Sequence, residues 1–579
     1  MRKLSKYYKP YILHILALIF LVGVQVLADL TLPTYMAKIV DDGVMEQNIN
    51  NVLINGALML GVTIIGVLAV ILISLISSRM SASISKNMRT DVFSKVESFS
   101  LSEFDKFSTA SLITRSTNDI QHVQMFTMIF FRFIISAPIM VVGGLYKAIN
   151  TNIKLSWIFV AAIPLVFIII LVIMIKLMPT FINLQKLLDK LNLVSREQLT
   201  GIRVIRALNT QDHELQRFEK ANRNLTDRNI FVNRVMAVMN PAMQLIMNFM
   251  TVVIIWLGAK MVETGELKIG DISAYTQFAM IVMFGFMIFT FIFIMIPRAI
   301  VSARRISEVL DEAPTIVDPE DPVESNSAVD GDIIFSDVSF SYNDADESVL
   351  SNISFRAKKG ETTAIIGSTG CGKSTLINLI PRFYDVTKGE VLIDGVNVKD
   401  YTQKELREKI GYVPQRGVLF SGTIESNLRV GNENASEEDI KEALEIAQAD
   451  FVYTEMKDGI NTEIAQGGQN VSGGQKQRLS IARALIKKPD IYIFDDSFSA
   501  LDFKTDSMLR KALSEKIKDA TIIIVAQRIN TIVDAHQIIV LDEGKIMGIG
   551  THEELLKECE TYREIALSQL SEEELNERK

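Results

Sequence analysis

The first three hundred residues alternate between long apolar runs and polar stretches. Six of the runs are long enough for a helix to cross a bilayer core of ~30 Å, which takes roughly 20 apolar residues. They lie near residues 11–36, 52–78, 127–148, 155–177, 239–262 and 272–297. The pattern therefore predicts an all-α membrane domain of six transmembrane helices over residues 1–310.

The polar stretches between these runs differ in length and charge. Those after the second and fourth runs are long, roughly fifty to sixty residues each, and helical in pattern, whereas the others are short. Both long stretches carry many Lys and Arg residues, such as Arg89 in the first and Arg203 in the second. By the positive-inside rule, both long loops and both chain ends are expected in the cytoplasm.

Asp29 interrupts the first apolar run, with Gln25 nearby. A carboxylate at such a position is expected to face a water-filled cavity or a partner rather than lipid. Two interpretations remain open: a residue of a substrate pathway, or a polar packing contact near the outer end of the helix.

The composition changes after residue 310. Residues 311–332 are rich in Pro, Asp, Glu and Ser and have no apolar periodicity, which is typical of a surface linker. Residues 333–579 have the pattern of an ordinary α/β domain. The chain is therefore expected to be multi-domain, with one membrane domain followed by one soluble domain.

Overall charge and cysteine content exclude several classes of protein. The net charge of −8 provides no global basic field, so no nucleic-acid partner is expected. The two cysteines, Cys371 and Cys559, are far apart and unlike any metal-ligand spacing. They exclude a disulfide framework and fit a reducing cytoplasm.

A phosphate-binding motif opens the soluble domain. An apolar strand leads through a Gly-rich turn into a helix and matches G-x-x-x-x-G-K-[S/T] in the required context. The glycines let backbone N–H groups converge on phosphates, Lys373 adds a cation, and Ser374 adds a hydroxyl ligand for Mg²⁺. The predicted nucleotide-binding residues are Gly367, Ser368, Thr369, Gly370, Cys371, Gly372, Lys373, Ser374 and Thr375.

Two further segments supply polar groups that suit the same site. The apolar run Ile491–Phe494 predicts a buried strand whose end delivers Asp495 to the Mg²⁺ shell. Gln415 follows Gly-Tyr-Val-Pro and has a side-chain amide that is able to reach metal or water. Ser374, Gln415 and Asp495 are therefore the candidate metal ligands.

A second anion-binding segment lies at Val471-Ser-Gly-Gly-Gln-Lys-Gln-Arg. Ser472 is expected to cap a helix, and Gly473 and Gly474 open backbone N–H groups at its positive end, beside Gln475. One domain offers no second phosphate for this segment. Head-to-tail pairing of two such domains, with nucleotide between them, is therefore expected.

The ordered set of motifs closely resembles a half-transporter of the ATP-binding cassette (ABC) exporters, and the resemblance covers essentially the whole chain. It identifies a Walker A motif, a Q-loop, an S-G-G-Q signature, a Walker B strand and a D-loop at Ser499-Ala-Leu-Asp502. It implies an α/β P-loop NTPase cassette that binds ATP with Mg²⁺, with Tyr342 stacking on adenine. It further implies contact with membrane lipids in a bacterial plasma membrane, and coupling helices near 102–111 and 209–218.

The sequence departs from that family at two positions of the hydrolytic site. The family's usual glutamate after Walker B is Asp496 here, and its switch histidine is Gln527. Aspartate is one methylene shorter, and displacing a general base by about 1 Å can cost on the order of 10²-fold in rate. Glutamine cannot carry the positive charge of an imidazolium. Asp496, Gln527 and Gln415 thus form the candidate catalytic set of a site that binds ATP but cleaves it poorly.

An intact signature beside an impaired hydrolytic site is similar to the degenerate-site subunit of bacterial heterodimeric multidrug exporters. That resemblance implies a second, non-identical half-transporter as partner and a hydrophobic or amphipathic small molecule as substrate. Three alternatives stay open: a homodimeric exporter with slow hydrolysis, a lipid flippase, and a nucleotide-gated regulatory membrane protein. Met and Phe side chains in the last two runs suit varied apolar ligands, but they equally suit helix packing. The sequence singles out Met243, Met247, Phe249, Met283, Phe284, Phe286 and Met287.

Overall fold

The computed structural model describes residues 4–323, 331–342 and 347–570 and divides them into two compact units. The first, the membrane unit, runs to Glu97 and resumes from Thr109 to Glu312. The second, the cassette unit, comprises Ser98–Ser108 and the chain from Ala313 onward. The middle of the predicted linker, residues 324–330, lies outside the described residues.

The described part of the membrane unit contains six helical stretches that are long and apolar enough to cross a bilayer, as the sequence predicts. Several continue far beyond the apolar runs, because the polar loops are helical too. At 1.5 Å per residue, the 49 residues of α2 span about 70 Å, more than twice a bilayer core. The elements are η1 (Leu4–Tyr7), η2 (Lys9–Tyr11), α1 (Ile12–Lys38), η3 (Ile39–Met45), α2 (Ile49–Glu97), α4 (Thr109–Thr114), η4 (Arg115–Asp119), α5 (Ile120–Ile129), η5 (Phe130–Ile134), α6 (Ser136–Thr151), α7 (Trp157–Thr200), α8 (Ile202–Ala207), α9 (Gln211–Glu263) and α10 (Ile269–Asp311).

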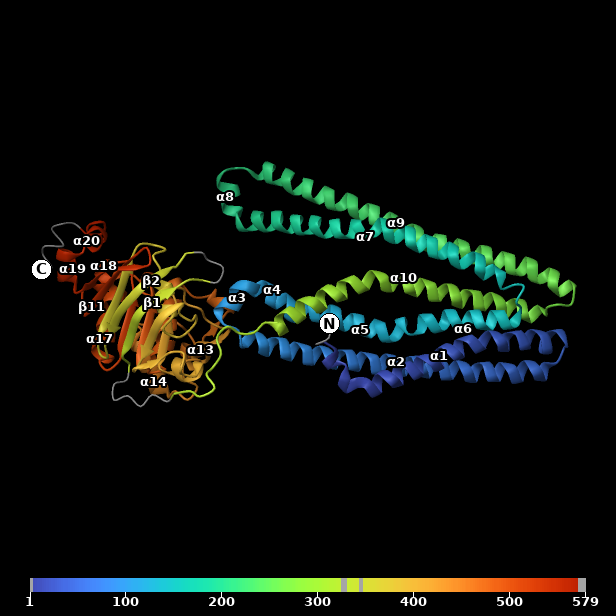
Figure 1. Cartoon of the computed structure of the whole chain (residues 1–579), viewed down its shortest axis with the longest axis horizontal. Helices are drawn as coiled ribbons and strands as arrows, with labels where there is room; N and C mark the ends of the chain where they lie inside the picture. Colours follow the sequence, from blue (N-terminus) through green and yellow to red (C-terminus); the bar gives the residue numbers. More distant parts are fainter. Residues whose placement is uncertain (1–3, 324–330, 343–346, 571–579) are drawn as a thin grey trace. The chain divides into compact units, whose positions relative to one another are not determined.

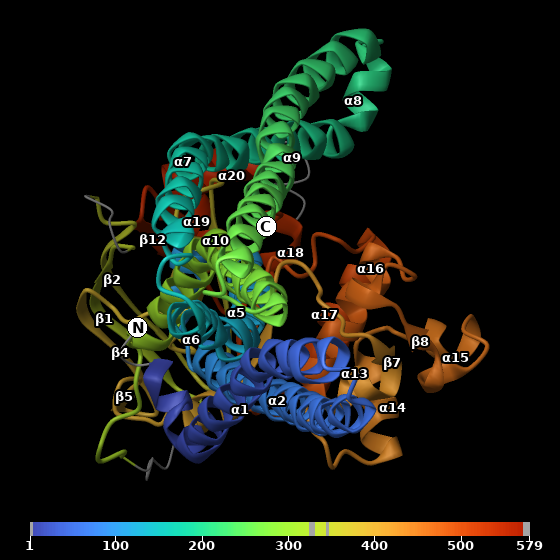
Figure 2. The same ribbon diagram turned by 90° about the vertical axis from the view of Figure 1, so that its right-hand side faces the viewer.

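Helices α7 and α9 form a long antiparallel pair that carries the short helix α8 at its end (Figures 1 and 2). Both views show this end standing away from the other helices of the membrane unit. The expected coupling helix over residues 209–218 is wrong in position: the short helix is Ile202–Ala207. Asn209 adopts a positive φ of 54°, which ends that turn, and residues from Gln211 onward already belong to α9.

The described part of the cassette unit contains two large sheets, a two-stranded sheet formed by β7 and β8, and two hydrophobic cores. An antiparallel sheet has the strand order β2-β1-β4-β5, and a mainly parallel sheet has the order β12-β11-β3-β10-β9-β6. The strands are β1 (Ile333–Phe340), β2 (Leu350–Ala357), β3 (Thr362–Gly367), β4 (Lys388–Ile393), β5 (Val396–Asn397), β6 (Ile410–Val413), β7 (Gly422–Thr423), β8 (Glu463–Ile464), β9 (Ile491–Asp495), β10 (Thr521–Val525), β11 (Gln537–Asp542) and β12 (Lys545–Gly550).

Helices cover the sheets and connect their strands. They are α3 (Leu101–Phe107), α11 (Lys373–Asn378), α12 (Gln403–Glu408), α13 (Ile424–Arg429), α14 (Glu437–Ile446), α15 (Phe451–Thr454), η6 (Gly459–Asn461), η7 (Gln466–Gly468), α16 (Gly473–Leu485), α17 (Phe503–Lys516), α18 (Ile529–Ile532), α19 (His552–Glu558) and α20 (Glu560–Leu567). This six-helix membrane domain followed by an α/β cassette is the fold that the sequence predicts.

The register of the parallel strands assembles the site. Val525 of β10 lies opposite Ile365 of β3 on one side and Asp495 of β9 on the other. Val413 of β6 lies opposite Phe494 of β9. Because parallel strands end at the same edge of a sheet, the segments after β3, β6, β9 and β10 all emerge together.

Helix α3 belongs to the cassette unit although it lies between α2 and α4 in the sequence. The Tyr384 hydroxyl donates to Asp105 Oδ2 at 3.1 Å, and the backbone N–H of Thr315 donates to Glu103 Oε1 at 3.2 Å. A short helix was expected over residues 102–111. The observed helix ends at Phe107, because Ser108 has a positive φ of 59° and α4 begins at Thr109.

Candidate functional site

The Gly-rich loop between β3 and α11 is shaped by glycines that no other residue can replace without rearrangement. A Cβ on Gly367 would lie 1.9 Å from the Leu541 carbonyl oxygen, and one on Gly372, whose φ is +101°, would lie 2.8 Å from Leu350. Gly370 also has a positive φ of 87°, but the space around its Cβ position is open. The loop therefore presents bare backbone to an open space, as a phosphate cradle requires.

Side chains of the same loop surround this cradle. Lys373 Nζ donates to the carbonyl oxygens of Gly367 and Ser368, at 2.8 and 2.7 Å. The Cys371 side chain is buried, with its sulfur 3.7 Å from Lys373 Nζ, so only its backbone is available to a ligand. The loop thus fits an anionic triphosphate by shape and charge.

The structure brings together two of the predicted metal ligands. Ser374 Oγ donates to Asp495 Oδ1 at 3.0 Å across the ends of β3 and β9. Burial raises the pKa of the Asp495 carboxyl group above its ordinary value, against the hydrogen bond from Ser374, and the negative charge of Asp496 adds to the rise. A hydroxyl and a buried carboxylate are oxygen ligands of the kind Mg²⁺ prefers, and a divalent cation would favour the ionised carboxylate.

The third predicted metal ligand, Gln415, contacts the neighbouring aspartate. Gln415 Nε2 donates to Asp496 Oδ2 at 3.1 Å, and Gln527 Nε2 donates to the same oxygen at 2.8 Å. A carboxylate oxygen has about two acceptor positions, so these two amides occupy Oδ2. The predicted catalytic set is therefore one hydrogen-bonded cluster. Asp496 itself is buried, with a positive φ of 46°.

Tyr342 lies beside the phosphate loop. Its hydroxyl is 2.9 Å from Thr375 Oγ1, and its ring packs edge-on against Phe340 and Tyr384. The side chain is half-buried. The Tyr342 ring therefore packs against two other aromatic rings within the cassette. Its exposed part leaves room for a nucleotide base to stack on the ring.

The signature segment has the local structure that the sequence predicts. Ser472 Oγ accepts from the Gln475 N–H at 3.2 Å, while Gln475 Oε1 accepts from the Ser472 N–H at 2.9 Å, forming a capping box at the start of α16. Gly473 has no atom within 4 Å of its Cβ position. Among the described residues, no hydrogen bond joins this segment to the phosphate loop of the same chain.

Gln477 is a residue whose contribution sequence reasoning missed. Its side-chain amide accepts from the Gly417 N–H at 2.9 Å and donates to the Pro414 carbonyl at 3.1 Å. It thereby ties the loop that carries Gln415 to the signature helix α16. The only signal in the sequence is that Gln477 is a polar residue on the apolar face of that helix. In the structure this residue is 1% exposed, and a buried amide of this kind needs hydrogen-bond partners.

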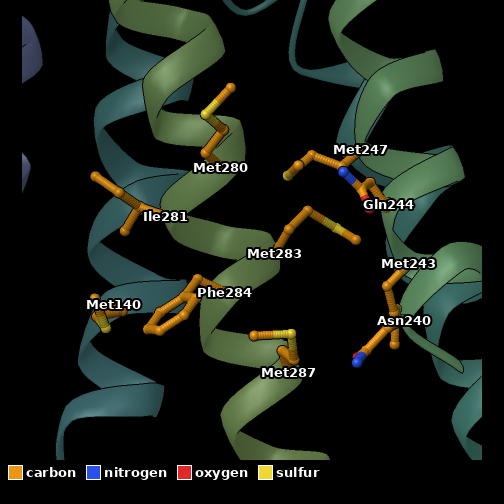
Figure 3. Close-up of a pocket in the computed structure, with 10 residues that line it drawn as sticks. All are labelled: Met140, Asn240, Met243, Gln244, Met247, Met280, Ile281, Met283, Phe284 and Met287. Carbon is orange, nitrogen blue, oxygen red and sulfur yellow. The ribbon is translucent and has the colours of Figure 1, made fainter. Parts of the chain in front are cut away.

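The membrane unit holds a separate pocket of about 620 Å³ between α6, α9 and α10 (Figure 3). Five of the Met and Phe residues that the sequence singles out line it, together with the amides of Asn240 and Gln244. Phe249 and Phe286 from the same pattern are not in the lining. The lining residues are Met140, Asn240, Met243, Gln244, Met247, Met280, Ile281, Met283, Phe284 and Met287.

Asp29 lies outside that lining, half-buried on α1. The Gln25 side chain, one turn earlier on the same helix, lies near the Asp29 carboxylate. The two interpretations of this residue therefore both remain predictions.

An ATP-type phosphate cradle, a serine–aspartate metal pair and a signature helix, on a cassette joined to six membrane-spanning helices, define one half of an ATP-driven transporter. The chain belongs to the ABC transporter family. The family model for the ABC transporter transmembrane region matches residues 15–287, and the ABC transporter model matches residues 350–499. The chain is thus a subunit of an ATP-hydrolysing ABC exporter that uses Mg²⁺, with its helices in the membrane and its cassette in the cytoplasm.

Similar proteins cover the chain from end to end. An uncharacterized ABC transporter ATP-binding protein of Mycobacterium tuberculosis is 41% identical over 98% of this chain and 97% of its own length. The uncharacterized ABC transporter ATP-binding protein YfiB of Bacillus subtilis is 38% identical over 99% of both. A solved bacterial Atm1-family ABC exporter with ATP bound has a TM-score of 0.80 and 25% identity, covering 98% of this chain and 99% of that one.

Proposed function

We propose that this chain is the degenerate-site subunit of a heterodimeric exporter of amphipathic or hydrophobic compounds. The observation that carries the proposal is the hydrogen bonding of Asp496, whose Oδ2 accepts from both Gln415 and Gln527. In this role the site of this chain holds ATP for long periods, and a partner's site carries most of the hydrolysis.

Two features of the Asp496 cluster support slow cleavage. The carboxylate is one methylene shorter than the family's glutamate, which withdraws it from an attacking water, and two amide donors occupy one of its oxygens. Gln527 is neutral, so it offers hydrogen bonds but no charge to a γ-phosphate. Lys373, Ser374 and Asp495 nonetheless keep the groups that hold ATP and Mg²⁺.

The intact signature supports pairing with a second half-transporter. Ser472 and Gly473 are exposed at the N-terminus of α16, where backbone N–H groups favour an anion. At the cytoplasmic end of the α7–α9 pair, Leu199, Val204 and Leu208 are each more than 60% exposed. Clustered exposed apolar side chains outside the bilayer are typical of a protein interface, which fits a partner subunit.

The membrane pocket supports an apolar or amphipathic substrate. Its volume of about 620 Å³ suits a drug-sized molecule, and the described residues of its lining include no Asp, Glu, Lys or Arg. Six of the ten lining residues are methionines, whose flexible thioethers adapt to ligands of different shape. The amides of Asn240 and Gln244 add hydrogen-bonding groups on the α9 side.

The decisive experiment compares this chain alone with this chain in its native complex. The tagged chain is purified from its own host, and the co-purifying half-transporter is identified by mass spectrometry. We expect a non-identical partner with a Walker B glutamate and a switch histidine, and ATPase activity for the pair but little for the chain alone. A homodimer that hydrolyses ATP and exports a substrate would contradict the proposal and favour the homodimeric alternative.

A further inference from the structure

A second pocket of the membrane unit lies at its cytoplasmic side and differs in chemistry from the methionine-rich one. It has a volume of about 570 Å³ and lies between α2 and the continuous segment η4–α5. Its lining residues are Arg89, Thr117, Gln121, Gln124, Met125 and Met128. The volume is within the range of pockets that hold small organic ligands, about 300–1,000 Å³.

Three hydrogen-bonding side chains of this pocket, Arg89, Gln121 and Gln124, are available to a ligand. In the described part of the chain, neither the Arg89 guanidinium nor the amides of Gln121 and Gln124 have a hydrogen-bond or ion-pair partner. Two other cations of the same region are paired, Arg115 with Glu308 at 2.9 Å and Lys6 with Asp91 at 2.8 Å. No carboxylate is among the described lining residues, and the one formal charge among them is the positive charge of Arg89.

The pocket is graded from polar to apolar along its length. Ser78, at the end of the second apolar run, donates to Met128 Sδ at 3.9 Å, which places Met128 level with the membrane boundary. Arg89 follows Ser78 by eleven positions on α2, and Thr117 precedes Met128 by eleven on the opposite wall, so both lie about 16 Å farther into the cytoplasm. Gln121, Gln124 and Met125 lie between, in that order.

The wall that carries this gradient contains an irregularity. Thr117 lies in η4, a π-helical turn over Arg115–Asp119, where the hydroxyl groups of Ser116 and Thr117 bond back to Leu112 and Ile113 carbonyls. Such turns are frequent at functional sites, because they change which side chains a helix presents.

We infer that this pocket receives an amphiphile with an anionic head, such as a phosphate or carboxylate, before export. The head lies at Arg89 and Gln121, and the apolar end points toward Met125, Met128 and the membrane. Arg89 supplies planar donors matched to such anions, and the thioethers accept varied apolar ends. The inference rests on the proposed export of amphipathic compounds and narrows that class to anionic ones.

The test uses the native complex in phosphatidylcholine nanodiscs, with calorimetric titration of three probes: octyl phosphate, octyltrimethylammonium and inorganic phosphate. We expect octyl phosphate to bind most tightly, and its affinity to fall about tenfold in Arg89→Gln, a change of about 1.4 kcal/mol. The matched control Arg223→Gln, which removes an exposed arginine of α9, should bind as wild type does. Gln121→Glu, which keeps Arg89, should also weaken octyl phosphate by like-charge repulsion.

Three results would overturn the inference: equal octyl phosphate affinity in wild type and both pocket variants, equal binding of the cationic probe, or binding of inorganic phosphate as tight as that of octyl phosphate. Phosphatidic acid added to the discs identifies the source of the ligand. If phosphatidic acid competes with octyl phosphate for binding, the ligand is a lipid with an anionic headgroup. If phosphatidic acid does not compete, the ligand is a soluble amphiphile. If octyl phosphate binds through Arg89 but the complex exports no amphipathic compound, the inference about this pocket is supported and the proposed export function is wrong.

Discussion

Gln527 donates its side-chain amide to Asp496 at 2.8 Å, and the two residues belong to segments that follow neighbouring strands, β10 and β9. Because Gln415 donates to the same carboxylate oxygen at 3.1 Å, that oxygen is held from two sides. The residues that depart from the family's pattern are therefore in direct contact, and their effects on hydrolysis should be coupled rather than additive.

Replacing both residues should restore part of the missing hydrolysis. Asp496→Glu extends the carboxylate toward the water, and Gln527→His replaces a neutral amide with a side chain able to carry charge. In a complex whose partner's catalytic glutamate is replaced by glutamine, we expect the double variant to raise ATPase activity about tenfold or more. Each single variant should recover less than half of that gain.

The matched control is the same partner substitution without the two repairs, which should leave little activity. No recovery in the double variant, with an intact signature on the partner, would show that another feature limits hydrolysis. High activity before repair would show that Asp496 is a competent base.

Removing the phosphate-loop cation should affect binding more than turnover. Lys373→Ala is expected to weaken retention of labelled ATP by this chain's site while the complex keeps more than about half of its ATPase activity. The comparison is removal of the partner's catalytic glutamate, which should abolish turnover. If both changes reduce ATPase activity equally, the two sites are not asymmetric in the proposed way.

Elements defined by local pattern could be predicted from the sequence. The six apolar runs and the strand–loop–helix around Lys373 need only neighbouring residues, so their type and approximate position follow from periodicity. The capping box at Ser472 and Gln475 is equally local.

The remaining contacts could not be predicted because they join distant segments. Gln477 reaches a loop 60 residues away, and Thr315 reaches Glu103 over 212 residues, so neither pair is visible before the chain is folded. The position of α8 was missed for a different reason. The turn at Asn209 depends on a positive φ. Asn adopts a positive φ more readily than most residues, but most Asn residues do not, so the sequence alone does not predict the turn.

A charge placed on the signature should damage the partner's site without damaging this cassette. The nearest atom to a Cβ on Gly474 is the Ala500 carbonyl oxygen at 3.5 Å, an ordinary contact, so a side chain fits there. Gly474→Asp should therefore fold, yet repel a γ-phosphate brought by the partner and lower ATPase activity by about 10²-fold. Gly474→Ala separates charge from size and should retain most activity. Normal turnover in Gly474→Asp would show that this signature is not part of the working site.

The contact between Glu103 and Thr315 joins helix α3 to the start of the cassette unit. Glu103 is 2% exposed, and its carboxylate also accepts from the Ser100 N–H and hydroxyl, both at 2.7 Å. Glu103→Gln should lower the free energy of unfolding of the cassette by about 1–3 kcal/mol, because an amide nitrogen then faces buried donors. It should also reduce substrate-stimulated ATPase activity more than basal activity. The matched control Glu97→Gln, at an exposed glutamate at the end of α2, should change neither.

The pH dependence of this contact follows from the same hydrogen bonds. Burial acts to raise the pKa of Glu103, but the hydrogen bonds from Ser100 and Thr315 outweigh it and hold the pKa below its ordinary value of 4.5. Because the pKa of Glu103 is lower in the folded state than in the unfolded state, the ionised carboxylate stabilises the fold. This stabilisation is fully present at pH values above the unfolded-state pKa, and it is lost as the pH falls through the folded-state pKa. Substrate stimulation should therefore stay constant from pH 8 to about 5.5 where basal activity permits its measurement. A loss of stimulation within that range in wild type, but not in Glu103→Gln, would show that the carboxylate is not held ionised.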